Sequence, residues 1–200
     1  MAKELTSRDK QALATKNKIY KCGVRLLEKH GYDNITVEQI AQKANVSVGT
    51  YYHYFPSKFD LLTEVYRQGD LFFKTQISDL LHRYDNCAER ITEYFVLYAH
   101  LSIDSGIEMI SKLYVPTNTM FITQGRIMQD LLTDILRQGQ ENGELTDVIA
   151  AEIITEKLFI VARGVIFDWC LRKGKSDLIA DMTEFVGNQA GAYLLTKNKL

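Results

Sequence analysis

The sequence predicts an all-α protein. Apolar residues recur at helical spacing along most of the 200 residues. No run alternates apolar and polar residues between turn dipeptides, as a half-buried strand does. Only two residues are proline, which favours long uninterrupted helices. Hydrophobic residues make up 46% of the chain and aromatic residues 10%, which is enough for a packed core and too much for a disordered chain.

The first predicted helix covers about residues 14–30. Small or apolar side chains recur on one of its faces at three- and four-residue spacing, which indicates a buried stripe. Gly31 follows directly and suits the left-handed conformation that commonly ends a helix. The members of the stripe are Ile19, Cys22, Gly23, Leu26 and Leu27.

Two short helices follow, separated by a tight turn. Thr36 is expected to cap the first of them, because a glutamine three positions later completes a capping box. That helix ends near Ala44. Ser47 is expected to cap the next helix, over residues 48–55, which Pro56 stops. Two short helices joined by a turn of three or four residues form a helix-turn-helix.

Longer helices are expected after this motif. We therefore divide the chain into a helix-turn-helix domain, residues 1–57, and a helical domain, residues 58–200. The predicted helices of the second domain cover residues 58–82, 88–103, 106–114, 121–141, 148–172 and 177–197.

The third helix presents a surface suited to DNA. Tyr51 and Phe55 stand four positions apart and are expected to face the core. The outward positions are then small or hydrogen-bonding, and none is acidic. They are Gly49, Thr50 and His53, flanked by Tyr52 and Tyr54. A helix fits the major groove of B-DNA while the preceding helix braces it. The alternative is a small helical subdomain, but three tyrosines and a histidine within four positions cannot all be core.

Charge is distributed unevenly along the chain. The formal net charge is −1, which argues against a uniformly basic nucleic-acid binder. Residues 1–66 carry ten basic and seven acidic side chains, a net charge of +3, so residues 67–200 carry −4. Residues 1–66, which we call the head, are thus mildly basic although the whole chain is nearly neutral. This predicts local DNA binding with few phosphate contacts.

The head resembles the N-terminal domain of TetR/AcrR-type transcriptional regulators. The resemblance lies in Thr-Val-Glu-Gln-Ile-Ala, residues 36–41, and in Ser-Val-Gly-Thr-Tyr-Tyr-His-Tyr-Phe-Pro-Ser-Lys-Phe-Asp-Leu-Leu, residues 47–62. It covers about residues 15–65, and the rest of the chain matches the family in architecture and not in motif. It implies DNA contacts from Lys16, Lys18, Thr36, Ser47, Val48, Gly49, Thr50, Tyr52, His53, Tyr54 and Lys58.

Base readout is expected from Val48, Thr50 and His53 in this surface. The recognition helix has no arginine, so the usual bidentate contact to guanine is absent there. The operator sequence stays open.

The last two predicted helices suggest a dimer. Residues 148–171 are apolar on nearly every side, and such a helix is buried on two faces. We expect a two-fold four-helix bundle made of these helices from two subunits, which the resemblance also implies. The alternative is a monomer with a central hydrophobic helix. The interface residues expected are Phe159, Ile166, Met182, Val186, Ala190 and Tyr193.

The resemblance also implies an effector pocket in the second domain. Aromatic and methionine side chains recur on its helices, and tyrosines on apolar faces could orient a ligand in an apolar cavity. The alternative is that this stripe is core. The ligand-binding residues expected are Tyr94, Tyr98, Met109, Tyr114, Phe121, Met128 and Trp169.

Other classes of protein are disfavoured. We find no zinc-ligand spacing, G-x-S-x-G motif, glycine-rich phosphate loop or paired carboxylates near a histidine, so neither an enzyme nor a cofactor or metal site is expected. The cysteines Cys22, Cys87 and Cys170 form no disulfide framework. Charged residues interrupt the most apolar stretch, 158–171, and the N-terminus is polar, so a cytoplasmic protein without a membrane partner is expected.

The prediction is a sequence-specific DNA-binding repressor, released from its operator by a small-molecule effector. Its expected partners are an operator duplex, an effector of unknown identity and a second copy of the chain. The effector would favour a state in which two recognition helices no longer match successive major grooves. The helix from Lys58 joins the domains and is the expected lever. The alternatives are an activator and a ligand-independent protein that organises the chromosome.

Overall fold

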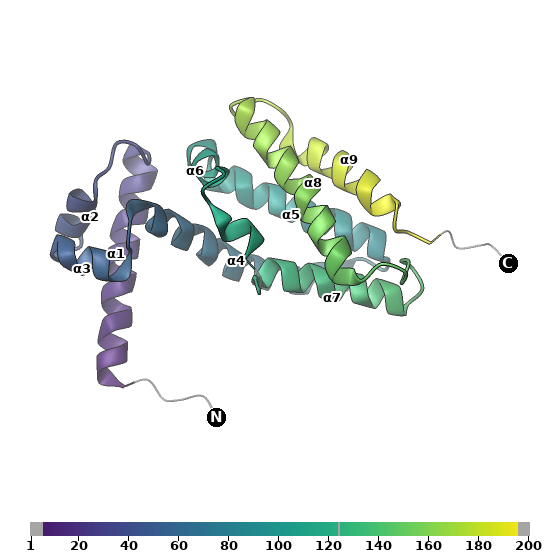
Figure 1. Cartoon of the computed structure of the whole chain (residues 1–200), viewed down its shortest axis with the longest axis horizontal. Coiled ribbons are helices and arrows are strands. Elements are labelled where there is room, and N and C mark those ends of the chain that lie inside the picture. The colour runs from purple at the N-terminus through teal and green to yellow at the C-terminus, as the bar shows by residue number, and fades with distance from the viewer. Residues whose placement is uncertain (1–5, 124, 196–200) are drawn as a thin grey trace. The chain divides into compact units, whose positions relative to one another are not determined.

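The computed structural model describes residues 6–123 and 125–195, and within this part of the chain it is helical without a named strand. The all-α fold class is confirmed (Figure 1). The helices are α1 (Ser7–His30), α2 (Val37–Lys43), α3 (Val48–Tyr54), α4 (Lys58–Arg83), α5 (Cys87–Ser105), α6 (Ile107–Leu113), the 3₁₀ helix η1 (Thr119–Ile122), α7 (Ile127–Glu141), α8 (Ala151–Leu171) and α9 (Leu178–Gly191).

The chain forms two compact units, residues 1–68 and residues 69–200. The domain boundary predicted from the sequence lies between residues 57 and 58, at the start of α4. Helix α4 begins in the first unit and ends in the second as one continuous helix. Among the described helices, none combines the length and apolar character that crossing a membrane requires.

Three helices differ from the prediction by six or more residues at one end. Helix α1 begins at Ser7, because Thr6 and Asp9 form a capping box seven residues before the expected start. The predicted helix 121–141 is divided into η1 and α7, with Gly125 between them at a φ of 75°. Helix α9 ends at Gly191, and the backbone of the following residues pairs with residues 144–146. Residues 196 and 197 of the predicted last helix lie outside the described residues.

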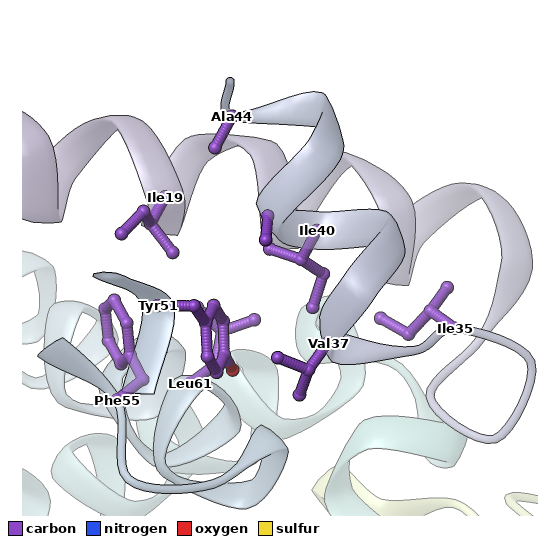
Figure 2. Packing of buried hydrophobic residues seen from close by; sticks show 9 residues of the cluster. Ile19, Ile35, Val37, Ile40, Ala44, Tyr51, Phe55 and Leu61 are labelled. Carbon is purple, nitrogen blue, oxygen red and sulfur yellow. The ribbon is translucent and has the colours of Figure 1, made fainter. Parts of the chain in front are cut away.

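The first unit is built around one apolar cluster (Figure 2). Each fully buried aliphatic or aromatic side chain contributes about 1.5–3 kcal/mol of transfer free energy. Gly23 is required where α1 meets α4, since an added Cβ would lie 2.3 Å from Cδ2 of Leu61. The buried residues of the cluster are Ile19, Ile35, Val37, Ile40, Ala41, Ala44, Tyr51, Phe55 and Leu61.

The second unit is a bundle built mainly of α5, α7, α8 and α9. Helix α5 packs on α7 and α9, and α8 packs on the same two helices. Helix α6 contacts α5 and α8. Aromatic rings fill the interior and meet mostly edge to face, an arrangement that favours their quadrupoles. These rings belong to Phe73, Tyr94, Phe95, Tyr98 and Phe159.

Candidate functional site

The helix-turn-helix is formed by α2, a turn and α3. The hydroxyl of Thr36 accepts a hydrogen bond from the Gln39 N–H at 3.3 Å, and the Gln39 side chain accepts one from the Thr36 N–H at 2.9 Å. Asn45 adopts a φ of 51° in the turn, a conformation that asparagine tolerates. The Ser47 hydroxyl accepts from the Thr50 N–H at 3.0 Å. Both predicted caps are therefore present.

Helix α3 presents the face that the spacing predicts. Tyr51 and Phe55 are buried in the first unit, whereas Val48, Gly49 and His53 are exposed. An added Cβ at Gly49 would meet just the Ser47 hydroxyl, at 3.8 Å, so a partner can approach the backbone here closely.

The flanks of this face are less uniform. Tyr52 is 46% exposed and stands edge-on to Tyr51. Thr50 is half-buried, with its hydroxyl 2.8 Å from that of Ser47. Tyr54 is half-buried against the apolar cluster, where its ring meets His53. The free surface of the recognition helix is thus made mainly of Val48, Gly49, Tyr52 and His53.

Tyr51 fixes the end of α3 to the start of α4. Its hydroxyl donates a hydrogen bond to the Ser57 carbonyl oxygen at 3.1 Å. Burial, with a smaller contribution from the Asp60 carboxylate, raises the pKa of Tyr51. The phenol therefore stays protonated and acts as a hydrogen-bond donor inside the domain.

Lys58 has internal partners. Its ammonium donates to the carbonyl oxygens of Tyr32 at 2.7 Å and Ile35 at 2.9 Å, and it lies 4.2 Å from the centre of the Tyr32 ring. Two of its three protons thus bind the loop between α1 and α2. Contact with a DNA phosphate remains a prediction, and any such contact uses the proton that is left.

The two lysines of α1 that were predicted to contact DNA have different surroundings in the structure. The Lys16 ammonium is 3.4 Å from a Glu64 carboxylate oxygen and 5.6 Å from the centre of the Phe55 ring. Lys18 is exposed, and Lys21 and Arg25 are exposed one and two turns further along. Lys21 and Arg25 are not among the residues predicted from the sequence, although their spacing from Lys18 places all three on one helical face.

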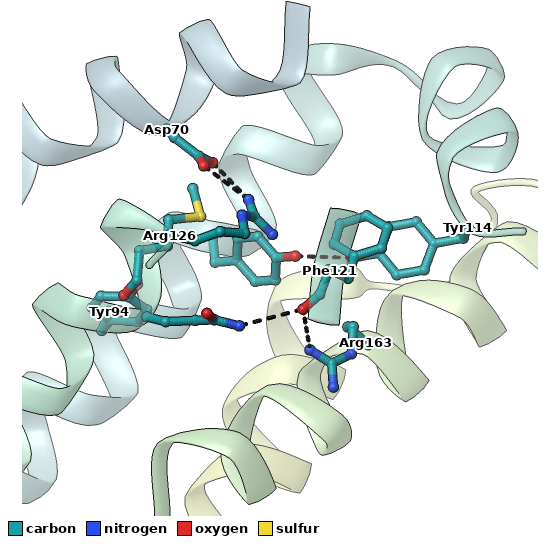
Figure 3. Close-up of polar contacts among 9 residues, drawn as sticks. Asp70, Tyr94, Tyr114, Phe121, Arg126 and Arg163 are labelled. Atoms are coloured by element: carbon teal, nitrogen blue, oxygen red, sulfur yellow. Dashed lines mark hydrogen bonds and ion pairs between the residues drawn. The ribbon is translucent and has the colours of Figure 1, made fainter. Parts of the chain in front are cut away.

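Five of the seven predicted ligand-binding residues gather in the interior of the second unit, and Figure 3 shows Tyr94, Tyr114 and Phe121 among them. The Tyr94 hydroxyl donates to the Met128 carbonyl oxygen at 2.6 Å, and the hydroxyls of Tyr98 and Tyr114 are 3.0 Å apart. The rings of Tyr114 and Phe121 are 4.6 Å apart. Burial raises the pKa of Tyr94 well above its usual value. These side chains pack against one another as core residues do, and the tyrosine hydroxyls form hydrogen bonds.

The other two predicted residues lie elsewhere in the second unit. Trp169 is at the end of α8, where it and Ile107 lie beside Gly174. Met109 is half-buried on α6. Whether any of the seven contacts a ligand remains a prediction.

A cleft between α7 and α8 was missed by the sequence analysis. Its volume is about 430 Å³, within the range of small-molecule sites. On one wall, the Phe121 carbonyl oxygen accepts hydrogen bonds from Gln129 and Arg163, both at 3.3 Å (Figure 3). The polar residues at positions 152, 155, 156 and 163 of a largely apolar helix could have indicated it. The lining residues are Phe121, Ile122, Gly125, Gln129, Asp130, Thr133, Glu152, Thr155, Glu156 and Arg163.

The residues predicted at a dimer interface lie in the interior of the second unit. Phe159, Ile166, Met182, Val186, Ala190 and Tyr193 are all buried within one copy of the chain, so they have almost no surface to offer a partner. The opposite face of the same two helices carries large apolar side chains that are 47–65% exposed. These are Ile160, Phe167 and Leu171 of α8, with Ile153 at 49%, and Phe185 of α9.

The comparisons with known proteins agree with this architecture. The family model described as "Bacterial regulatory proteins, tetR family" matches residues 19–65. The Fatty acid metabolism regulator protein of Bacillus subtilis is 22% identical over 170 residues, which are 81% of this chain and 87% of that protein. The HTH-type transcriptional regulator YvdT of Bacillus subtilis is 30% identical over 122 residues, 54% of this chain and 63% of that protein.

Solved structures share the fold over nearly the whole chain. The Thermus thermophilus FadR repressor in complex with lauroyl-CoA has a TM-score of 0.79 at 18% identity, covering 92% of this chain and 98% of that one. The RolR complex with resorcinol has a TM-score of 0.69 at 20% identity, covering 94% and 98%. Residues 19–65 thus match the TetR family model, and the whole chain shares its fold with TetR-family transcriptional regulators.

Proposed function

We propose that this protein is a homodimeric repressor that binds an operator duplex through α3. A fatty acyl-CoA would release the repressor from this duplex. The observation that carries the proposal is the exposed face of α3 in a domain that matches the family model. The site of action would be the cytoplasm, where operator DNA is found.

The recognition surface suits a duplex. Val48 offers an apolar contact for a thymine methyl group, and Tyr52 and His53 offer hydrogen bonds to phosphates or base edges. Gly49 allows close approach of the backbone. One short helix reads few base pairs, so a two-fold dimer that reads two half-sites about 34 Å apart would supply the specificity.

The exposed apolar face of α8 and α9 is the surface proposed for dimerisation. Ile153, Ile160 and Phe167 follow one another at intervals of seven residues, which places them along one helical line. Gly164 lies between them with open space around its Cα, so a partner helix can approach closely. Phe185 contributes from α9, and a contiguous face of this kind marks an interaction site.

The effector class is proposed from the relatives. The Bacillus subtilis fatty acid metabolism regulator and the Thermus repressor, whose structure contains lauroyl-CoA, each match most of the chain. An acyl chain would lie among the aromatic side chains of the second unit, which pack against one another and would have to move apart to admit it. The α7–α8 cleft carries the carboxylates of Asp130, Glu152 and Glu156, which would repel the phosphates of CoA, so the nucleotide end would lie away from them.

The test begins with a duplex selected from a random library by the full-length protein. Its affinity is then measured by fluorescence anisotropy with lauroyl-CoA, stearoyl-CoA, CoA alone or resorcinol. We expect one of the acyl-CoAs to weaken binding at least tenfold while CoA alone has no effect. Failure to select any duplex would contradict the operator function. Selection followed by release with resorcinol alone would contradict the acyl-CoA assignment, and persistence of the complex with every compound would favour a ligand-independent protein.

A further inference from the structure

A buried ion pair links α4 to the start of α7. Nη2 of Arg126 is 2.9 Å from both carboxylate oxygens of Asp70, and the two side chains are 11% and 7% exposed. We propose that this ion pair couples the α7–α8 cleft to α4, so that occupation of the cleft changes the restraint on that helix. The inference rests on the proposed function, namely control of DNA binding by a ligand.

Arg126 stands at a position that does not favour a cation. It is the N-cap residue of α7 and makes no side-chain capping hydrogen bond. The N-terminus of a helix carries a partial positive charge, which is why acidic and small polar residues are preferred there. The Asp70 carboxylate compensates for both the helix dipole and the burial of the guanidinium. Because both side chains are buried, separating them costs free energy, so the paired and separated arrangements are two distinct states.

The segment that carries Arg126 also forms a wall of the cleft. The Arg126 guanidinium lies 5.7 Å from the centre of the Phe121 ring, and the Phe121 carbonyl oxygen is held by Gln129 and Arg163 (Figure 3). Phe121, Gln129 and Arg163 all line the cleft, as does Gly125. A ligand that engages Gln129 or Arg163 would remove their hydrogen bonds to Phe121.

The backbone can respond to that loss. Gly125 precedes Arg126 with a φ of 75°, a conformation that glycine adopts at little cost, so the segment can rotate at this point. Rotation would withdraw Arg126 from Asp70. Because Asp70 belongs to α4, which continues to Lys58 in the first unit, the change reaches the helix shared by both units. Contacts thus run without a gap from cleft to helix, as physical coupling requires.

The experiment fills the cleft with a covalent label, so the measurement requires neither effector nor DNA. Cys22→Ser and Cys170→Ser remove the accessible thiols, and Cys87 is buried. Glu156→Cys then supplies a thiol on the exposed lip of the cleft, to be alkylated with N-ethylmaleimide or the larger N-phenylmaleimide. Hydrogen–deuterium exchange of the α4 backbone is measured before and after alkylation.

We expect the larger label to speed exchange in α4 at least threefold when the ion pair is intact. In an Asp70→Asn background, exchange should already be fast and the label should add nothing. Arg126→Lys, which retains the charge, serves as the second variant if Asp70→Asn does not fold. Asp134→Asn is the matched control, because it removes a surface aspartate–arginine pair that also involves α7.

Two results would overturn the proposal. One is an unchanged α4 exchange rate after alkylation, and the other is an equal acceleration in the native and Asp70→Asn backgrounds, which a merely structural ion pair predicts. Neither result depends on an operator or an acyl-CoA, so each is distinguishable from failure of the proposed function.

Discussion

The ammonium of Lys58 lies 4.2 Å from the centre of the Tyr32 ring while it donates a hydrogen bond to the Tyr32 carbonyl oxygen at 2.7 Å. A residue at the start of α4 thereby anchors the loop between α1 and α2. We expect Lys58→Ala to lower the free energy of unfolding by about 1–3 kcal/mol, since hydrogen bonds from a charged group are lost. Urea denaturation measures this. Unchanged stability with weakened DNA binding would instead make Lys58 a DNA contact alone.

Tyr52 tests the recognition surface without disturbing the core. Its side chain is 46% exposed, so Tyr52→Ala should weaken operator binding about tenfold, the effect of losing one specific contact, at unchanged stability. Binding by fluorescence anisotropy and melting by circular dichroism give the two values. Val148→Ala, which truncates an exposed residue of the second unit, is the control. Equal affinities for Tyr52→Ala and the wild type would remove Tyr52 from the interface.

Two glycines in the first unit should respond in opposite ways to alanine. At Gly23 the added Cβ would lie 2.3 Å from a Leu61 methyl carbon, so Gly23→Ala should destabilise the protein by about 1–3 kcal/mol through overpacking. At Gly49 the space is open, so Gly49→Ala should raise stability by up to about 1 kcal/mol and lower DNA affinity. Thermal unfolding of the two variants checks this prediction, and similar losses at both positions would contradict it.

The exposed face of α8 predicts how the dimer can be broken. Phe167→Glu places a charge on a side chain that is 47% exposed, so it should yield folded monomers. Met182→Glu places a charge in the core and should unfold the protein. Light scattering with circular dichroism distinguishes the cases. A folded dimer of Phe167→Glu would place the interface elsewhere.

Cys87 predicts a pH dependence of stability. Burial, followed by the nearby Glu144 carboxylate, raises the pKa of Cys87 to about 12 from the ordinary thiol value of 9.0. The folded state thus keeps a proton that the unfolded state loses above pH 9, and the stabilisation present below pH 9 declines as the pH rises towards 12. The stability difference between wild type and Cys87→Ala should be constant below pH 8.5 and change in favour of Cys87→Ala above pH 9. A constant difference up to pH 10.5 would contradict this prediction.

The helix-turn-helix could be predicted from the sequence because its determinants are local. The caps at Thr36 and Ser47 and the four-residue spacing of Tyr51 and Phe55 each act within one or two turns. Apolar spacing predicts a start of α1 that is too late in the chain. The helix begins earlier because the polar capping box of Thr6 and Asp9 precedes the apolar stripe.

The second unit was less predictable for a physical reason. Helix α8 is apolar on nearly every side, so spacing alone could not say whether Ile166 or Phe167 faces the core. The structure buries Ile166 and exposes Phe167. The partners of Asp70 and Gln129 come from distant parts of the chain or from the backbone, which no spacing rule reveals.

We propose that a ligand controls the binding of a specific DNA duplex by this chain. The most direct test of this proposal is the affinity of the selected duplex for the wild-type protein with and without lauroyl-CoA or stearoyl-CoA, at fixed salt. We expect tight, specific binding that one of these acyl-CoAs weakens at least tenfold. Equal binding to the selected duplex and to random DNA, or an affinity that neither acyl-CoA changes, would contradict it.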